Sequence, residues 1–264
     1  MQDKGYTTRE LWIPDSAGGI YGKLYLPERA ERPRLAVYAH EIGCTHATAQ
    51  PYAEHLARRG LALFAPDFRG GGEHSRSDGD SLDMSVLTEA DDLELVFDAA
   101  RRWTEVDGEK PVLIGGSQGG LVAAIYAGRH PERVGALIEL YPAFNIPDAM
   151  RAAVSSPEEA PERQFFNGWI WMGRRYFRDM WDYDPYGESM RYKGHVLILH
   201  GDADDIISID YSRRAAEKYA DAEFHAIRNG KHMFSGDALS EALGYIDGFL
   251  EKHGLLPAEV TSDG

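Results

Sequence analysis

A serine flanked by glycines is the residue of this chain best suited to nucleophilic chemistry. Residues 115–119 read Gly-Gly-Ser-Gln-Gly and fit the pattern G-x-S-x-G, which places Ser117 on a sharp turn between a strand and a helix. Small neighbours give the chain room to make that turn. The turn lifts the Ser117 hydroxyl clear of the sheet and leaves the Gln118 N–H at a helix N-terminus, where it can face an oxyanion. The alternative is a glycine-rich turn with an incidental serine.

A serine hydroxyl attacks only when a neutral imidazole takes its proton and an acid orients that imidazole. Three acids, Asp202, Asp204 and Asp205, directly follow an apolar run that ends at residue 199. Asp204 is our choice, and the other two are alternatives that otherwise cap a turn or carry solvated charge. His232 lies after the last expected strand and is our choice of base. The order serine, acid, histidine is that of one known triad arrangement.

The remaining candidates are weaker. Six other histidines fall on expected helices, inside a strand or at strand ends, where packing roles are expected: His40, His55, His130, His200, His225 and His253. A second oxyanion donor is expected from the loop at 39–43, where we choose the Ile42 N–H to act with that of Gln118.

The elements that must position these residues alternate between strands and helices. Two alternating runs, 6–14 and 20–27, predict an antiparallel hairpin. Further strands are expected at 35–39, 61–65, 111–114, 134–140, 195–199 and 223–227. Helices are expected at 50–59, 86–100, 118–128, 211–219 and 239–253. The sequence therefore predicts an α/β fold with a mostly parallel eight-stranded sheet and helices on both faces.

One long segment interrupts this alternation. We expect no strand between about 145 and 193, and nine aromatic residues lie between 165 and 186. A gap of that length implies a small helical cap. The predicted domains are a core of residues 1–144 and 194–254, a cap of residues 145–193 and a flexible tail of residues 255–264.

Charge and composition exclude several functions. The 264 residues include 43 acidic and 28 basic side chains, giving a formal net charge of -15. A polyanion meets net repulsion, so neither nucleic acid nor an anionic membrane is an expected partner. No apolar run is long enough to span a bilayer and the start is polar, so we expect a cytoplasmic protein. The single cysteine, Cys44, excludes an intrachain disulfide and a multi-thiolate metal site.

Between about residues 20 and 253 the chain resembles the α/β-hydrolase superfamily, and more narrowly the bacterial cinnamoyl or feruloyl esterases and related carboxylesterases. The motifs that carry the resemblance are Asp67–Gly72, Asp83–Leu87, Gly115–Gly120, Tyr141–Ala143, His200–Asp204 and Gly230–Phe234. The resemblance implies a cap after the sixth strand and a serine carboxylesterase that hydrolyses a small ester through an acyl-enzyme. It implies no metal and no organic cofactor, and it implies a homodimer because such relatives are often dimers.

In such esterases an aspartate and a tyrosine of the cap contact the ring hydroxyl of a hydroxycinnamoyl group. Asp148 and Tyr176 look like the matching positions, and Trp169 is a further cap residue that we expect at the substrate. The family usually has His-Gly-aromatic where this chain has His-Glu-Ile at 40–42. Glu41 is therefore expected to place a negative charge beside the oxyanion loop, where it disfavours an anionic substrate.

Fold and triad do not set the acyl or leaving group. The alternatives are a general short-chain carboxylesterase, a thioesterase, a lipid acyl hydrolase or an enzyme acting on amides. A remoter alternative is a non-catalytic module that holds a small apolar ligand under the aromatic cap.

Overall fold

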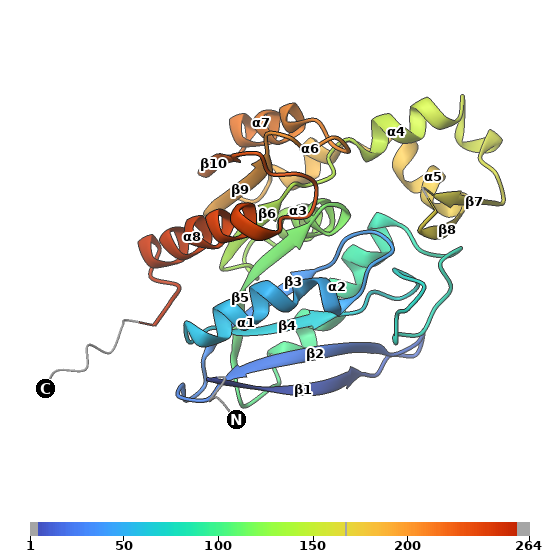
Figure 1. Cartoon of the computed structure of the whole chain (residues 1–264). Helices are drawn as coiled ribbons and strands as arrows, with labels where there is room; N and C mark the ends of the chain where they lie inside the picture. The colour runs from blue at the N-terminus through green and yellow to red at the C-terminus, as the bar shows by residue number, and fades with distance from the viewer. Residues whose placement is uncertain (1–4, 167, 258–264) are drawn as a thin grey trace, which may run out of the picture.

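The expected eight-stranded, mostly parallel sheet is confirmed in the computed structural model, which describes residues 5–166 and 168–257. The strand order is β1-β2-β4-β3-β5-β6-β9-β10, in which β1 and β2 run antiparallel to their neighbours and the others are parallel (Figure 1). The strands are β1 (Tyr6–Ile13), β2 (Ile20–Pro27), β3 (Arg34–Ala39), β4 (Ala62–Pro66), β5 (Asp107–Gly116), β6 (Ala136–Leu140), β9 (Val196–Gly201) and β10 (Ala222–Ile227). The end of the expected tail, residues 258–264, lies outside the described residues.

Helices cover both faces of the sheet, because neighbouring residues of each buried strand point to opposite sides. Helices α1 (Gln50–Arg58) and α8 (Gly236–Lys252) pack on the face that contains Tyr38. Helices α2 (Val86–Ala100), α3 (Gln118–Arg129) and α7 (Ile209–Lys218) pack on the face that contains Val37. A short 3-10 helix, η1 (His46–Ala49), precedes α1. Figure 1 shows the two layers on either side of the sheet.

The strand register brings the expected site loops to one edge. Ala39 of β3 pairs with Gly115 of β5, and Gly116 pairs with Leu140 of β6. Leu140 in turn pairs with Leu199 of β9. The loops that follow these four strands therefore start side by side at the carboxyl edge of the sheet, where ligands bind in folds of this class.

The expected cap segment contains a strand pair, which corrects our prediction that it has none. Its elements are α4 (Ile146–Ala153), η2 (Pro157–Glu159), β7 (Arg163–Phe166), β8 (Ile170–Gly173), α5 (Arg174–Trp181) and α6 (Pro185–Ser189). Strands β7 and β8 form an antiparallel hairpin whose Ile170 and Met172 are buried, whereas Phe165 and Trp171 are exposed and lie ring against ring. The sequence did contain the signal, an Asn-Gly pair at 167–168 between aromatic runs.

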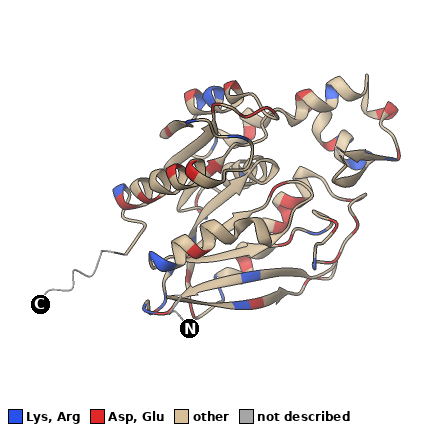
Figure 2. Cartoon of the chain, viewed as in Figure 1, with Lys and Arg blue, Asp and Glu red and all other residues tan. Residues whose placement is uncertain are grey.

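The described chain ends meet at the opposite edge of the sheet, where the parallel strands begin. A Cβ built on Gly60, just before β4, would lie 2.6 Å from Pro257. The carbonyl of Gly5 accepts a hydrogen bond from the Glu28 N–H, just after β2. Charged residues cluster on outer elements such as α8 (Figure 2). Among the described residues, no helix is both long and apolar enough to cross a bilayer.

Candidate active site

Ser117 occupies a strained turn between β5 and α3. Its backbone angles are φ 52° and ψ -119°, a conformation that L residues rarely adopt. The two outer glycines of the motif allow the tight turn, because a Cβ on Gly115 would lie 2.2 Å from the Gly119 carbonyl oxygen. A Cβ on Gly119 would lie 2.1 Å from that of Ala39. The Ser117 N–H donates to Leu140 O at 2.9 Å, which ties the turn to β6.

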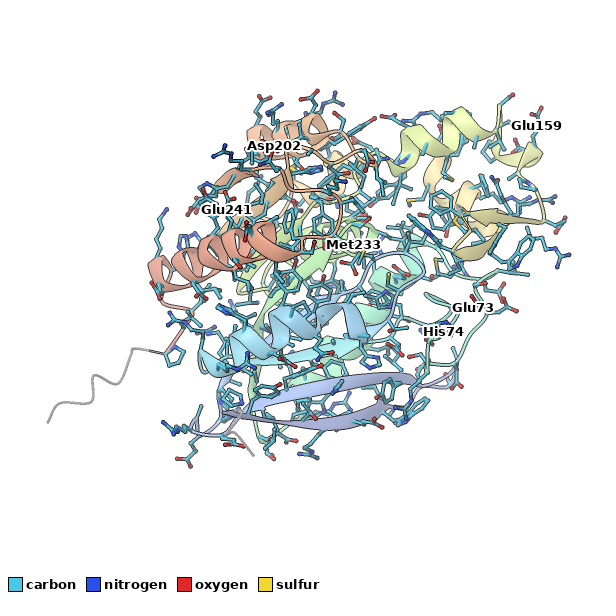
Figure 3. The ribbon with its side chains drawn as sticks, in the orientation of Figure 1. Glu73, His74, Glu159, Asp202, Met233 and Glu241 are labelled. Carbon is cyan, nitrogen blue, oxygen red and sulfur yellow. The ribbon has the colours of Figure 1, made fainter. Side chains whose placement is uncertain are left out.

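The structure brings Ser117, His232 and Asp204 together in the expected order. His232 Nε2 lies 3.0 Å from Ser117 Oγ, and His232 Nδ1 lies 2.8 Å from Asp204 Oδ2. Because the carboxylate only accepts, the ring proton sits on Nδ1 and leaves Nε2 able to accept the serine proton. The ring of Tyr141 packs 4.9 Å from the His232 ring. Met233, which follows His232, lies between the body and the cap in the view of Figure 3.

Asp204 is held as a carboxylate. Burial opposes its ionisation, but hydrogen bonds from His200 and His232 and from the Ile206 and Ile207 N–H groups outweigh burial and hold the pKa of Asp204 well below its usual value. The two backbone N–H groups donate to Oδ1 at 2.8 and 3.0 Å, so Oδ2 remains directed at His232. The acid is therefore negatively charged when His232 takes up a proton.

The alternative acids have other positions. Asp202 is exposed and accepts a hydrogen bond from the Asn229 N–H at 2.7 Å, and Asp205 is exposed on the same loop.

Two of the alternative histidines, His40 and His200, are fully buried, and each binds a backbone carbonyl within 3.0 Å. His200 Nε2 also lies 3.2 Å from Asp204 Oδ2, the oxygen that faces His232, so it supports the acid as a second neighbour.

The loop after β3 offers the second backbone donor. The Gly43 N–H donates to Gly71 O at 3.0 Å and the Cys44 N–H to Glu41 O at 3.1 Å, which fixes the loop around Ile42. Within residues 5–166 and 168–257, the Ile42 and Gln118 N–H groups donate to no acceptor. Two such N–H groups near a nucleophile can receive an oxyanion.

Glu41 differs from our expectation. Its side chain is 3% exposed and points into the protein, where Oε1 accepts hydrogen bonds from the hydroxyls of Tyr38 and Tyr141 at 2.9 and 3.0 Å. The carboxylate therefore does not face an incoming substrate, and the expected repulsion of anions at the mouth of the site has no structural basis.

Tyr176 also differs from expectation, because it is buried and has a protein partner. It is 2% exposed, and its hydroxyl donates to Gln118 Oε1 at 2.6 Å. Gln118 Nε2 donates to Glu89 Oε2 at 2.8 Å. Burial raises the pKa of Glu89 well above its usual value, more than the Gln118 hydrogen bond lowers it. Tyr176 thus links the cap to the residue that follows Ser117, and its hydroxyl is not directed at a ligand.

The other two expected substrate contacts lie apart from Tyr176. Asp148 is exposed on α4 and accepts hydrogen bonds from Arg151 and from Tyr211 of α7. Trp169 is 44% exposed, and its Cβ lies 3.5 Å from a Cβ built on Gly43, so it contacts the loop that carries Ile42. Of these two residues, Trp169 therefore contacts the oxyanion loop, whereas Asp148 contacts α7.

Sequence reasoning missed Glu89, although a signal was present. Glu89 follows Val86 by three residues and precedes Leu93 by four, so it lies on the apolar face of α2. A carboxyl on such a face requires a buried partner, which here is Gln118. Among the described residues, no group of three or more His, Cys, Asp or Glu side chains is arranged to hold a metal ion.

The link from Tyr176 to Gln118 leads to a testable expectation. Tyr176→Phe leaves Gln118 Oε1 buried without its donor, which costs about 1–3 kcal/mol of stability. We expect kcat to fall about three- to ten-fold because the Gln118 N–H loses its support. Tyr219→Phe is the matched control, since it removes a buried hydrogen bond from the hydroxyl of Tyr219, just after α7, to Glu139 of β6. Thermal unfolding should show both losses, while ester hydrolysis should slow only in Tyr176→Phe. Equal kcat values in the two variants would contradict this role.

Comparisons with known proteins agree with the geometry. The model of the prolyl oligopeptidase family matches residues 48–253. No curated protein sequence matches the chain. Est1E from Butyrivibrio proteoclasticus, solved with ferulic acid bound, is similar with a TM-score of 0.84 and 22% identity over 92% of this chain and 98% of that one.

Two further solved structures are similar. DcsB, in complex with its substrate analogue, has a TM-score of 0.77 and 17% identity over 94% of this chain and 99% of its own. A monoacylglycerol lipase from Paleococcus ferrophilus has a TM-score of 0.68 and 20% identity over 89% and 99%. At these identities the likenesses establish the fold.

Proposed function

The chain belongs to the prolyl oligopeptidase family and has an α/β-hydrolase fold, and from this premise we propose that it is a serine carboxylic ester hydrolase. The observation that carries the proposal is the hydrogen-bonded chain from Ser117 Oγ through His232 to Asp204 on a strained turn. The mechanism also needs a place for an oxyanion. Among the described residues, the Ile42 and Gln118 N–H groups donate no hydrogen bond and can supply that place.

The proposed reaction has two halves. Ser117 Oγ attacks the ester carbonyl while its proton moves to His232 Nε2, and the carbonyl oxygen becomes an oxyanion held by the Ile42 and Gln118 N–H groups. The tetrahedral intermediate collapses, the C–O bond to the alcohol breaks, and His232 returns the proton to the departing alcohol. Water then repeats the attack on the acyl-enzyme with His232 as base, and the acid leaves. Asp204 keeps the imidazole oriented and stabilises it while it is charged.

For the substrate, we propose esters of hydroxycinnamoyl-type or other small aromatic and short-chain acids. Two observations support this class. Est1E, of similar fold, was solved with ferulic acid, and the aromatic residue Trp169 of the cap contacts the loop that carries Ile42 through its Cβ. The family is named for peptidases, so a peptide amide, from which an amine would leave, is the competing substrate.

Initial rates on methyl ferulate, p-nitrophenyl acetate, p-nitrophenyl butyrate and a peptide p-nitroanilide test this proposal. We expect both the ferulate and the short-chain esters to be cleaved and the anilide to be left intact. Cleavage of butyrate with ferulate untouched would assign the chain to the general short-chain carboxylesterases. Cleavage of the anilide alone would contradict the proposed ester hydrolase function. Failure of a fluorophosphonate to label Ser117 would favour the alternative of a non-catalytic module that binds a small apolar ligand.

A further inference from the structure

A buried carboxyl group lies beside Gly116, the residue that precedes the proposed nucleophile. Glu41 is the residue before the proposed donor Ile42, yet its side chain points to the face of the sheet covered by α1 and α8. Its Oε1 accepts two hydroxyl bonds, from Tyr38 of β3 and from Tyr141 after β6. Burial raises the pKa of both phenols well above the usual value, so each keeps its proton and donates.

The same carboxylate interlocks with the turn that carries Ser117. A Cβ built on Gly116 would lie 2.3 Å from Glu41 Oε1 and 2.9 Å from the Tyr38 hydroxyl oxygen. Real Cβ atoms do not approach that closely, so the carboxyl fills the space that a side chain at 116 would need. The glycine at the variable position of G-x-S-x-G and the glutamate in the oxyanion loop therefore form a complementary pair.

These contacts join the parts whose spacing sets the oxyanion hole. The backbone of Glu41 is fixed on its other side, since its carbonyl accepts from the Cys44 N–H and from His40 Nδ1 at 2.8 Å. Its side chain then spans from the Ile42 peptide to the peptide before Ser117. Gln118 is held from the opposite face of the sheet by Tyr176 and Glu89. Each of the two proposed donors thus has its own buried polar anchor.

We propose that Glu41 is a positioning residue that fixes the Ile42 N–H relative to Ser117 through its contact with Gly116 and its two tyrosine hydrogen bonds. This inference rests on the proposed ester hydrolase function. It assigns the carboxyl a geometric role, in which the acceptor oxygen and its volume matter and the negative charge does not. Removing a single oxyanion donor costs about 10²–10³ in kcat, so a displaced donor should cost a measurable part of that.

Glu41→Ala and Glu41→Gln separate position from charge. In Glu41→Ala we expect kcat on p-nitrophenyl acetate and the rate constant for phosphonylation of Ser117 by a fluorophosphonate to fall about 10- to 100-fold, with KM within about three-fold of wild type. Glu41→Gln keeps an acceptor oxygen of the same size and should retain at least about a third of both rates. A Gln variant as slow as the Ala variant, or an Ala variant as fast as wild type, would overturn the proposal.

Gly116→Ala tests the pair directly. Alone it forces the new methyl group against Glu41 Oε1, so both rates should fall. In the double variant with Glu41→Ala the overlap with Oε1 is gone. The Tyr38 hydroxyl, 2.9 Å from the new methyl group, no longer has Glu41 as its acceptor and can shift away, so the rates should be no lower than in Glu41→Ala alone. Multiplicative losses in the double variant would contradict an interlock. Thermal unfolding of every variant shows whether a loss of rate reflects an unfolded protein, and Glu41→Gln decides the question if the others fail to fold.

The same measurements distinguish a failure of the positioning role of Glu41 from a failure of the proposed ester hydrolase function. If the wild type is not labelled by the fluorophosphonate, the proposed serine hydrolase fails. If the wild type is labelled and Glu41→Ala is labelled equally fast, the function stands and the positioning role fails.

Discussion

Replacing Ser117 with alanine is expected to lower kcat for ester hydrolysis by about 10⁴ to 10⁶. Among the described residues, Ser117 Oγ is the hydrogen-bond partner of His232 Nε2, at 3.0 Å. The variant therefore has no nucleophilic oxygen at the imidazole. Backbone donors and substrate binding remain and account for the residual rate. The substitution also removes no packing volume of consequence, so the fold should survive it. The measurement is kcat and KM on p-nitrophenyl acetate, with fluorophosphonate labelling in parallel.

Ser240→Ala is the matched control, because Ser240 is exposed on α8 and its hydroxyl bonds only to the Gly236 carbonyl among the described partners. It should keep the wild-type rate and the wild-type labelling. A Ser117→Ala protein that retained even a tenth of the activity would remove Ser117 from the mechanism.

The second large effect is expected from Asp204→Asn, which should lower kcat by about 10³ to 10⁴. An amide presents a donor as well as an acceptor, so it can turn the proton of His232 to the wrong nitrogen and cannot stabilise the charged ring. Asp205→Asn is the matched control, one residue away and exposed, and should remain active. If both variants lost activity equally, the acid would have been assigned wrongly within this loop.

Asp204→Asn also has an effect on stability with a defined sign. The pKa of Asp204 is lower in the folded protein than its unfolded value of about 3.9, so its ionisation stabilises the fold above about pH 4. That contribution is lost as the pH falls through the lowered folded pKa. The variant should therefore unfold more easily than wild type at pH 7, and the difference should shrink towards low pH in denaturant titrations.

The fold could be predicted from sequence where hydrophobic periodicity and turn residues agree. The β5 strand, the glycine-rich turn and α3 follow one another in residues 107–129, and each has a local pattern. Ser117, Asp204 and His232 could be predicted to meet because each follows a strand of the same parallel sheet, and carboxyl ends of such strands share an edge. The β7–β8 hairpin differs from the prediction because aromatic residues suit both a helical cap and a strand, and only the short Asn-Gly turn signal at 167–168 distinguishes the two.

The side-chain directions of Tyr176 and Glu41 could not be predicted, because they depend on contacts between distant segments. Tyr176 meets Gln118 across 58 residues, and Tyr141 meets Glu41 across 100. No local sequence pattern encodes whether a cap tyrosine faces a ligand or the protein interior. In either environment the ring packs against apolar groups and the hydroxyl has one polar partner. A polar residue in an otherwise apolar stretch signals a buried partner, but the partner itself appears only in three dimensions.

The arrangement of the chain ends has a practical consequence. Gly5 and Pro257 lie at the edge where the parallel strands begin, whereas the loops that carry Ser117 and His232 leave from the opposite edge. A tether attached at either of these positions would hold the molecule with its site turned outward. The protein can therefore be anchored to a bead or a sensor chip through a terminal tag, and the side of the molecule that carries Ser117 should face away from the support.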